Sequence, residues 1–419
     1  MESTRFKFNI SFSSSSKRIK SKAAFTLVEM LASLAVLALI MVILAQTFAT
    51  ISSTWKSTTS RGSSFAGARA AFETLRLNLS QATLNTYLGY ADKLGNTVPL
   101  LNPSYANAAG SLLRSRVPAQ YLRASELHFL TDQARVIFSD PSVNNPTKTS
   151  GQAVFFQAPA GIVNTPTDRP LGSLLNVLGY YVAFNSSEDF TPAALIPPAK
   201  PSIQKRWRYR LMEVIQPAET NAIYGSTCQV DPSTLIPVDN YDLSWIGRME
   251  DLTRTFPNTI QHVLAENIIT MALLPKLPPN TATTNGQQPL STDYSYDSRL
   301  WASGASLHGR TLDSRWRNQL PPLMELVIIT IDEPSAQRLA NLYDVNENNP
   351  TPPFSNPALI AKANNLDLST VFQTYHTQGP PSDLDADIAK VEAGLTALGV
   401  SYRIFRTDVA MNNSQWSSN

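Results

Sequence analysis

One long apolar segment near the N-terminus constrains this chain most. It runs from Phe25 to Ala45, reads FTLVEMLASLAVLALIMVILA, and has Glu29 as its only charged residue. As a helix rising about 1.5 Å per residue it would span roughly 30 Å, the thickness of a hydrocarbon core. Other apolar stretches, such as LVIITI at 326–331, have the length of buried strands. We therefore expect one transmembrane helix followed by a large soluble part.

The residues before this segment fix its orientation. Residues 1–24 hold Glu2 and the cations Arg5, Lys7, Lys17, Arg18, Lys20 and Lys22. Basic flanks stay on the cytoplasmic side, so the residues after 45 should lie across the membrane. The whole chain has a net charge of only +2, which gives no general attraction to nucleic acid or to an acidic partner. Its single cysteine, Cys228, excludes an internal disulfide.

Glu29 needs an explanation, because a carboxylate inside a membrane costs a few kcal/mol at a helix centre and usually has a partner. A secretory signal peptide has a shorter apolar region, about 7–15 residues, followed by a small-residue cleavage site that is missing here. An ordinary uncleaved anchor fits the length of the segment but leaves Glu29 unexplained. That alternative stays open.

The residues around Glu29 resemble the N-terminus of type IV prepilins. A basic leader ends in KSKAA at 20–24, FTLVEML follows, and the apolar helix continues. The resemblance implies that a prepilin peptidase cuts between Ala24 and Phe25 and N-methylates Phe25. It also implies that Glu29 neutralises the N-terminal ammonium of a neighbouring subunit and so sets subunit registry. Ala24 departs from the family, which usually has glycine before the cut.

Apolar side chains continue at helical spacing beyond the membrane segment, over residues 46–85. They form the series Phe48, Ile51, Trp55, Phe65, Ala68, Phe72, Leu75 and Leu79. Gly62 lies among polar residues at 57–64 and predicts a bend rather than an end of this helix. In pilins and pseudopilins, which the N-terminus resembles, the second half of such a helix packs on an antiparallel sheet.

Short segments rich in β-branched and aromatic residues predict strands in the rest of the chain. They lie at 125–130, 135–139, 153–158, 178–184, 207–215, 267–274, 324–332 and 401–409. Short helices are predicted at 334–343 and 383–398. The Pro- and Asn-rich stretches at 191–204, 275–293 and 344–365 are interpreted as surface insertions.

These segments predict an α+β, pilin-like fold, with a long N-terminal helix, transmembrane in its first half, packed on an antiparallel sheet with large loop insertions. The expected parts are the leader at 1–24, the transmembrane helix at 25–45, its amphipathic extension at 46–85 and a β-rich domain at 86–419. The order of segments is similar to the branch of PilW-type minor pilins and J-type pseudopilins. The size of the chain also resembles a family of prepilin-like proteins from Verrucomicrobia, Verru_Chthon cassette protein C.

Two segments mix cations with aromatic residues, which can stack on bases and bind phosphate. They contain Arg206, Trp207 and Arg208, and Arg315, Trp316 and Arg317. In the first segment, strand alternation sends the arginines to one face and the aromatic residues to the other, so a half-buried strand is the stronger interpretation. Nucleic acid is therefore not expected as a partner.

Two acidic segments resemble calcium loops. Asp344, Asn346 and Asn348 alternate in DVNENN, and DLDAD at 383–387 has a similar spacing. Neither has the glycine and glutamate of an EF-hand loop. Calcium at the first segment is a minor alternative, while the second fits the acidic first turn of a helix. No other cofactor is expected, since the four histidines have no zinc-ligand spacing.

The sequence shows no catalytic constellation, so an anchored hydrolase has the least support. We expect a non-enzymatic, pilin-like subunit in the bacterial inner membrane, with a cytoplasmic leader and a periplasmic C-terminal domain. Its partners would be a prepilin peptidase, other prepilin-like subunits and an inner-membrane assembly platform, in a pilus, a secretion pseudopilus or DNA-uptake machinery. The alternative is a membrane-anchored protein that displays its domain for DNA or polysaccharide.

Overall fold

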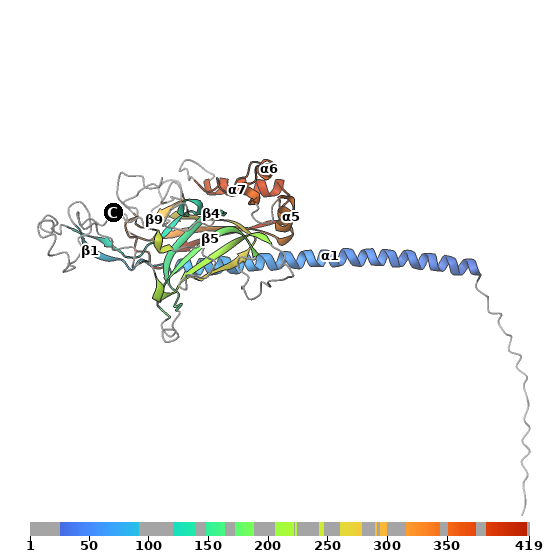
Figure 1. Cartoon of the computed structure of the whole chain (residues 1–419), viewed down its shortest axis with the longest axis horizontal. Coiled ribbons are helices and arrows are strands. Elements are labelled where there is room, and N and C mark those ends of the chain that lie inside the picture. The colour runs from blue at the N-terminus through green and yellow to red at the C-terminus, as the bar shows by residue number, and fades with distance from the viewer. Residues whose placement is uncertain are drawn as a thin grey trace, which may run out of the picture. The chain divides into compact units, whose positions relative to one another are not determined.

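The fold was analysed in a computed structural model (Figure 1). It describes residues 26–91, 120–138, 148–163, 172–187, 206–221, 223, 243–246, 260–278, 290, 294–299, 316–343, 351–373 and 383–416. The chain divides into two compact units, Met1–Thr58 and Thr59–Asn419. The described part of the first unit is helical, and the second unit holds all the described strands.

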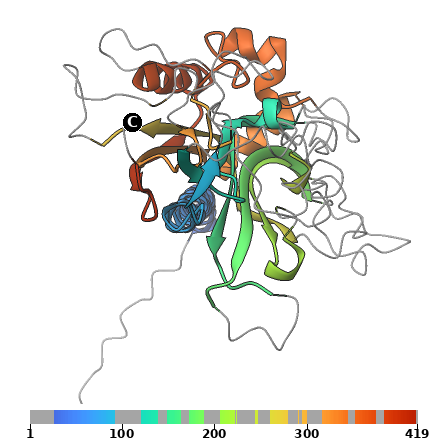
Figure 2. The ribbon, with the colours of Figure 1, turned by 90° about the vertical axis from the view of Figure 1, so that its left-hand side faces the viewer.

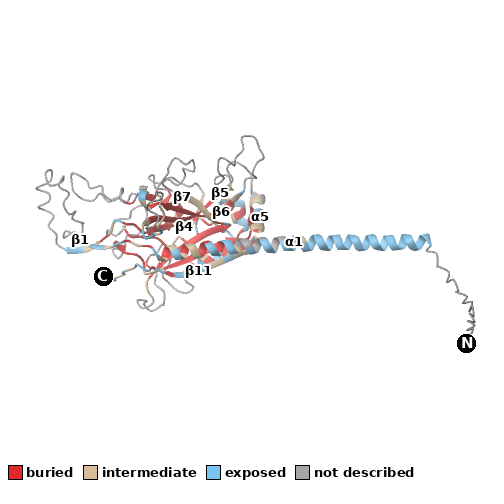
Figure 3. Cartoon of the chain, turned by 90° about the horizontal axis from the view of Figure 1, so that it is seen from below, coloured by how far each residue is buried: buried red, intermediate tan, exposed pale blue. Residues whose placement is uncertain are grey.

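Helix α1 extends from Leu27 to Ser80. Figure 3 shows most of its first-unit part as exposed, and no residue described there is buried. In the second unit one face of α1 is buried, through Ala68, Ala71, Phe72, Leu75 and Leu79. The predicted apolar stripe is confirmed for these residues. The helix is continuous through Gly62, and it ends at Ser80 rather than at 85.

The described strands form three antiparallel sheets, which confirms the α+β class. The six-stranded sheet has the order β7-β6-β5-β4-β3-β9, and the three-stranded sheet has the order β11-β10-β8. The strands of the first are β3 (Leu130–Gln133), β4 (Thr149–Pro159), β5 (Leu175–Ser186), β6 (Trp207–Gln216), β7 (Ile260–Glu266) and β9 (Tyr296–Asp297). Those of the second are β8 (Ile268–Lys276), β10 (Leu323–Ile331) and β11 (Tyr402–Ala410). A separate ribbon pairs β1 (Tyr87–Ala91) with β2 (Gln120–Ala124).

The second-unit part of α1 packs on both larger sheets. Asn78 donates a hydrogen bond of 2.7 Å to the hydroxyl of Tyr180 on β5. Phe72 contacts Phe405 on β11, with ring centroids 5.7 Å apart. Figure 2 looks nearly along α1 and shows strands of both sheets beside it. The buried stripe of α1 is therefore part of the core.

Strand β11 separates α1 from helix α7 (Asp383–Ala397). The guanidinium of Arg403 lies 5.2 Å from the ring centroid of Phe65 on α1. Arg406 points to the other side and pairs with Asp385 of α7 at 2.5 Å. Since successive strand residues alternate between faces, α1 and α7 cover opposite faces of the three-stranded sheet.

The two larger sheets meet where β4 passes the free edge of β8. Gln152 accepts a hydrogen bond from the backbone N–H of Leu273 and donates one of 3.1 Å to the carbonyl oxygen of Tyr294. Its neighbour Gly151 has a φ of +67°, and a Cβ there would overlap the carbonyl oxygen of Met271. Only glycine permits this conformation and this approach together.

The remaining helices are short. They are α3 (Ala134–Ile137), α5 (Glu333–Tyr343), α6 (Pro357–Lys362) and the 3-10 turns η5 (Ala218–Thr220), η6 (Ser244–Ile246) and η9 (Pro353–Ser355). The predicted helices at 334–343 and 383–398 are confirmed by α5 and α7. The predicted insertion at 344–365 contains η9 and α6, and the one at 275–293 begins inside β8. The insertion at 191–204 lies outside the described residues.

Two strand predictions are wrong. Residues 135–137 belong to the single helical turn α3, in which Ala134 and Ile137 bury one side. Residues 125–129 form no strand and bend at Glu126. Part of their backbone is bonded elsewhere, since Phe129 N–H donates to the hydroxyl of Ser298 at 3.0 Å. Strand β3 begins only at Leu130. The sequence did not predict β1, β2, β7, β9 or α6.

Candidate functional site

Helix α1 begins with a reciprocal cap formed by Thr26 and Glu29. The backbone N–H of Thr26 donates to Oε2 of Glu29 at 2.9 Å, and the Thr26 hydroxyl donates to the same oxygen at 3.1 Å. The backbone N–H of Glu29 in turn donates to the Thr26 hydroxyl at 3.3 Å. This is a capping box, which satisfies N–H groups that the first helical turn leaves free.

The cap stands at the start of the described helix that could cross a membrane. The span from Leu27 to Trp55 has a mean hydropathy of 2.7 and is 0% buried in the structure. By length and composition alone, this helix is consistent with membrane anchoring. Its far end carries three exposed side chains at helical spacing, Phe48, Ile51 and Trp55.

Among the described residues, Glu29 has hydrogen-bond partners but no counter-charge. Both donors from Thr26 are neutral groups, so neither could neutralise a charged carboxylate at the head of this apolar helix. The helix dipole favours that position by a few tenths of a kcal/mol to about 1 kcal/mol. A cation brought close in low dielectric would add a larger stabilisation. The arrangement can therefore receive a positively charged group.

The other predicted residues of the N-terminal site, Ala24 and Phe25, lie outside the described residues. Cleavage and methylation there remain predictions. Thr26 is a site residue that the sequence analysis missed. The spacing Thr-x-x-Glu before an apolar run would have revealed it, because it is the pattern of a capping box.

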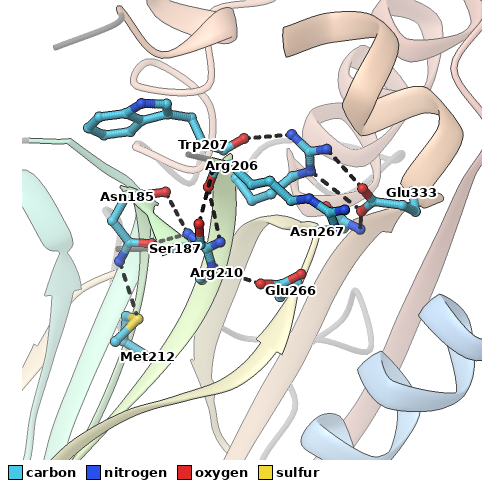
Figure 4. Close-up of polar contacts among 10 residues, drawn as sticks. Asn185, Ser187, Arg206, Trp207, Arg210, Met212, Glu266, Asn267 and Glu333 are labelled. Atoms are coloured by element: carbon cyan, nitrogen blue, oxygen red, sulfur yellow. Dashed lines mark hydrogen bonds and ion pairs between the residues drawn. The ribbon is translucent and has the colours of Figure 1, made fainter. Parts of the chain in front are cut away.

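Arg208, in the first basic-aromatic segment, is a structural ion-pair partner of Glu333, which is labelled in Figure 4. Its side chain is 5% exposed and donates to Glu333 of α5 at 2.8 Å and to the carbonyl oxygen of Trp207 at 2.8 Å. Asn267 also donates to Glu333, at 2.8 Å. Burial raises the Glu333 pKa, but these hydrogen bonds outweigh it and hold the pKa below its ordinary value. Arg208 thus joins β6 to α5.

Arg210, also on β6, bonds to the neighbouring strands of the six-stranded sheet. It is 1% exposed and donates to the carbonyl oxygen and Oδ1 of Asn185 at 2.5 and 2.7 Å. It also donates to the carbonyl oxygen of Arg206 at 3.2 Å and to Glu266 at 3.0 Å. The guanidinium therefore connects β5, β6 and β7. The prediction of a half-buried strand is wrong, since β6 is buried on both faces.

Arg206 and Trp207 keep some exposed surface. Arg206 is exposed, and the half-buried Trp207 stacks on Phe184 with centroids 5.8 Å apart. Nζ of Lys148 lies 4.6 Å from the Trp207 ring centroid. The adjoining cavity has a volume of about 10 Å³, room for roughly one water molecule. The structure thus offers these residues for surface contact only.

The second basic-aromatic segment has little surface to offer. Trp316 is 1% exposed, and its ring lies 5.1 Å from that of Tyr296. Burial lowers the pKa of Arg317 to about 10. Arg315 lies outside the described residues.

Of the two acidic segments, the structure describes only the second. Asp344, Asn346 and Asn348 lie outside the described residues, so the calcium alternative stays a prediction. In the other segment, Asp385 pairs with Arg406, and Asp387 accepts from the hydroxyl of Tyr294 at 3.1 Å and from Phe372 N–H at 3.2 Å. Among the described residues there is no cluster of three His, Cys, Asp or Glu side chains that could hold a metal ion.

A buried polar cluster that the sequence did not reveal lies between β3, β9 and η6. Nε2 of His128 is 2.7 Å from Oδ1 of Asp297, and Nε1 of Trp245 donates to Nδ1 of His128 at 3.1 Å. The exposed fractions of the three side chains are 1%, 1% and 0%. Because the cluster is enclosed, its hydrogen bonds serve the packing of these elements.

Comparison with known families gives a match at the N-terminus. Residues 19–45 match the family model of the prokaryotic N-terminal methylation motif. Comparison with curated proteins and with solved structures finds no match to the chain. The matched residues include Glu29, the cap and most of the apolar span. The chain therefore carries the N-terminal motif of type IV pilin-like proteins, which are processed structural subunits.

Proposed function

We propose that this chain is a minor pilin or pseudopilin, a non-enzymatic subunit of a pilus or secretion pseudopilus. The match of residues 19–45 to the N-terminal methylation motif carries this proposal. The capped apolar helix directly after the proposed cleavage position supports it. The PilW-type or J-type branch is the finer assignment within the same proposal.

The proposed maturation creates a positively charged partner for the carboxylate of Glu29. Cleavage between Ala24 and Phe25 frees an amine, and N-methylation leaves it positively charged. In a neighbouring subunit, the carboxylate of Glu29 receives this ammonium, and the pair is far more favourable in low dielectric than either charge alone. Glu29 thereby sets the register between subunits, while Thr26 holds its carboxylate at the helix start.

The proposed topology follows from the basic leader. The leader lies in the cytoplasm, where a prepilin peptidase and an inner-membrane assembly platform act on it, and the second unit lies in the periplasm. The other partners are sibling prepilin-like subunits.

Mass spectrometry of the chain purified from cells with a prepilin peptidase tests the processing step. We expect a mature chain that begins at Phe25 with a methylated amine. Ala24→Gly is the matched control, because it restores the residue usual before the cut. An intact leader in both proteins contradicts the proposal, whereas an intact leader in the wild type alone shows that Ala24 blocks the cut.

Two substitutions of Glu29 separate its charge from its cap. Glu29→Gln keeps a capping-box residue but removes the charge, and Glu29→Val removes both. We expect both variants to insert into the membrane, since a costly ion is gone, and to lose crosslinking to sibling subunits. Membrane fractionation measures insertion. If Glu29→Gln crosslinks as well as the wild type, the charge has no registry role, and the membrane-anchored binding protein becomes the better proposal.

A further inference from the structure

The exposed apolar side chains of the second unit gather on the ribbon of β1 and β2. Among the described residues beyond α1, the strongly exposed large apolar and aromatic side chains are Tyr87, Leu88 and Tyr121, at 50%, 71% and 61%. All three belong to this ribbon. Exposed apolar groups that lie together mark contact surfaces, whereas single ones do not, so the ribbon differs from the rest of the described surface.

The pairing of the two strands creates one aromatic face. Tyr90 lies opposite Tyr121, and their ring centroids are 4.8 Å apart. Leu88 is two residues from Tyr90 and so projects from the same side. We call Leu88, Tyr90 and Tyr121 the ribbon face. Tyr87 projects from the other side, where its hydroxyl donates to Glu126 at 2.7 Å.

The ribbon is held to the second unit at its base. The hydroxyl of Ser125 donates to the carbonyl oxygen of Leu84, and Asn318 donates to the carbonyl oxygen of Arg123 at 2.9 Å. A two-stranded sheet is only marginally stable by itself in water. Since the ribbon face has three apolar or aromatic side chains and none of the described sheets packs on it, a docked surface would stabilise it.

We propose that the ribbon face is a contact for a sibling prepilin-like subunit, a different chain with the same kind of N-terminal helix. This inference rests on the proposed function. The three side chains offer on the order of 300–400 Å², well below the roughly 800 Å² that each partner buries in a stable standard interface. A free second copy in solution would thus bind too weakly. A subunit already held nearby through its N-terminal helix meets the face at high effective concentration. Tyrosine is also enriched at such interfaces.

Site-specific photocrosslinking in the full chain tests the contact. A photoreactive residue replaces Leu88 or Tyr121, and Ala389 on the exposed side of α7 is the matched control. The cells produce the sibling prepilin-like subunits, and each position is combined with wild-type Glu29 and with Glu29→Val. We expect crosslinks to a sibling subunit, identified by mass spectrometry, from positions 88 and 121. The products should be absent from position 389 and lost with Glu29→Val.

Three results would overturn the contact. They are a homodimer crosslinked through position 88 or 121, an internal crosslink to residues 92–119, and no crosslink from either position while siblings still crosslink through α1. In each case a methylated Phe25 and Glu29-dependent crosslinking through α1 would leave the proposed function standing. Leu88→Ser gives a second readout. We expect it to leave the thermal unfolding of the full chain unchanged and to reduce assembly.

Discussion

Individual charged residues in this protein are placed by partners far away in the sequence. A chain of hydrogen bonds runs from α1 across the six-stranded sheet. Asn78 donates to Tyr180, the Tyr180 hydroxyl donates to Glu213 on β6, and Glu213 pairs with His262 on β7 at 2.8 Å. Glu213 is almost fully buried, whereas the His262 side chain is 45% exposed. This chain links the core helix to a titratable group that solvent can reach.

The pair of His262 and Glu213 predicts a pH-dependent stability. The hydrogen bond to Glu213 raises the pKa of His262 above 6.5. Burial raises the Glu213 pKa, but hydrogen bonds from His262 and Tyr180 outweigh it and hold it below 4.5. The pair therefore contributes fully to the free energy of unfolding between pH 4.5 and pH 6.5, the ordinary pKa values of the two groups. This contribution is lost as the pH rises through the raised pKa of His262, or as it falls through the lowered pKa of Glu213.

His262→Gln tests this prediction in detergent-solubilised full chain. The wild type should lose roughly 0.5 kcal/mol relative to the variant between about pH 6 and pH 8, a value reduced for the exposure of His262. Urea unfolding at each pH measures the difference. Identical pH profiles would show that the ion pair adds nothing to stability.

At the scale of elements, α1 and the two larger sheets depend on a few close approaches. The junction of β4 with β8 is one of these. Gly151 lies there with a positive φ, against the backbone of β8. Local sequence gives no sign of this contact, because Gly151 and Met271 are far apart in the chain.

Gly151→Ala should therefore destabilise the second unit. The added methyl group is strained by the φ of +67° and overlaps the carbonyl oxygen of Met271, so we expect a loss of roughly 2–4 kcal/mol. Gly67→Ala is the matched control, because a Cβ there meets nothing within 4 Å. In a helix it should be neutral or stabilising by up to about 1 kcal/mol. Thermal unfolding compares the two, and equal melting temperatures would contradict the described junction.

At the scale of the whole molecule, the two units differ in how far their described residues are buried. The span from Leu27 to Trp55 is 0% buried and adds nothing to the core, which takes its α1 residues from Ala68 onward. A chain that begins at Gln46 should thus keep the near-UV circular dichroism of the second unit and unfold cooperatively. A chain that begins at Asn78 lacks Ala68, Ala71, Phe72 and Leu75, and should fail to fold. If the longer chain also fails, the membrane segment contributes to the fold of the second unit.

The sequence by itself determined the features that depend on local pattern. The apolar span, Glu29, the buried stripe of α1 and helices α5 and α7 follow from composition and helical spacing along one segment. Strands β4, β5, β6, β8, β10 and β11 were predicted because each is a continuous run of β-branched and aromatic residues. The tertiary structure alone decided the rest. The turn α3 has the composition of a strand, and only packing makes it helical.

Distant pairing explains the other differences. In the sequence, Arg208 has the pattern of a ligand-binding arginine. In the structure it pairs with Glu333, which lies in a helix far along the chain. The His128 and Asp297 pair and the ribbon face likewise need segments that only the folded chain brings together. Local sequence carries hydrophobicity and backbone preference, whereas the partner of a polar group, and the surface left uncovered, are fixed by contacts between remote segments.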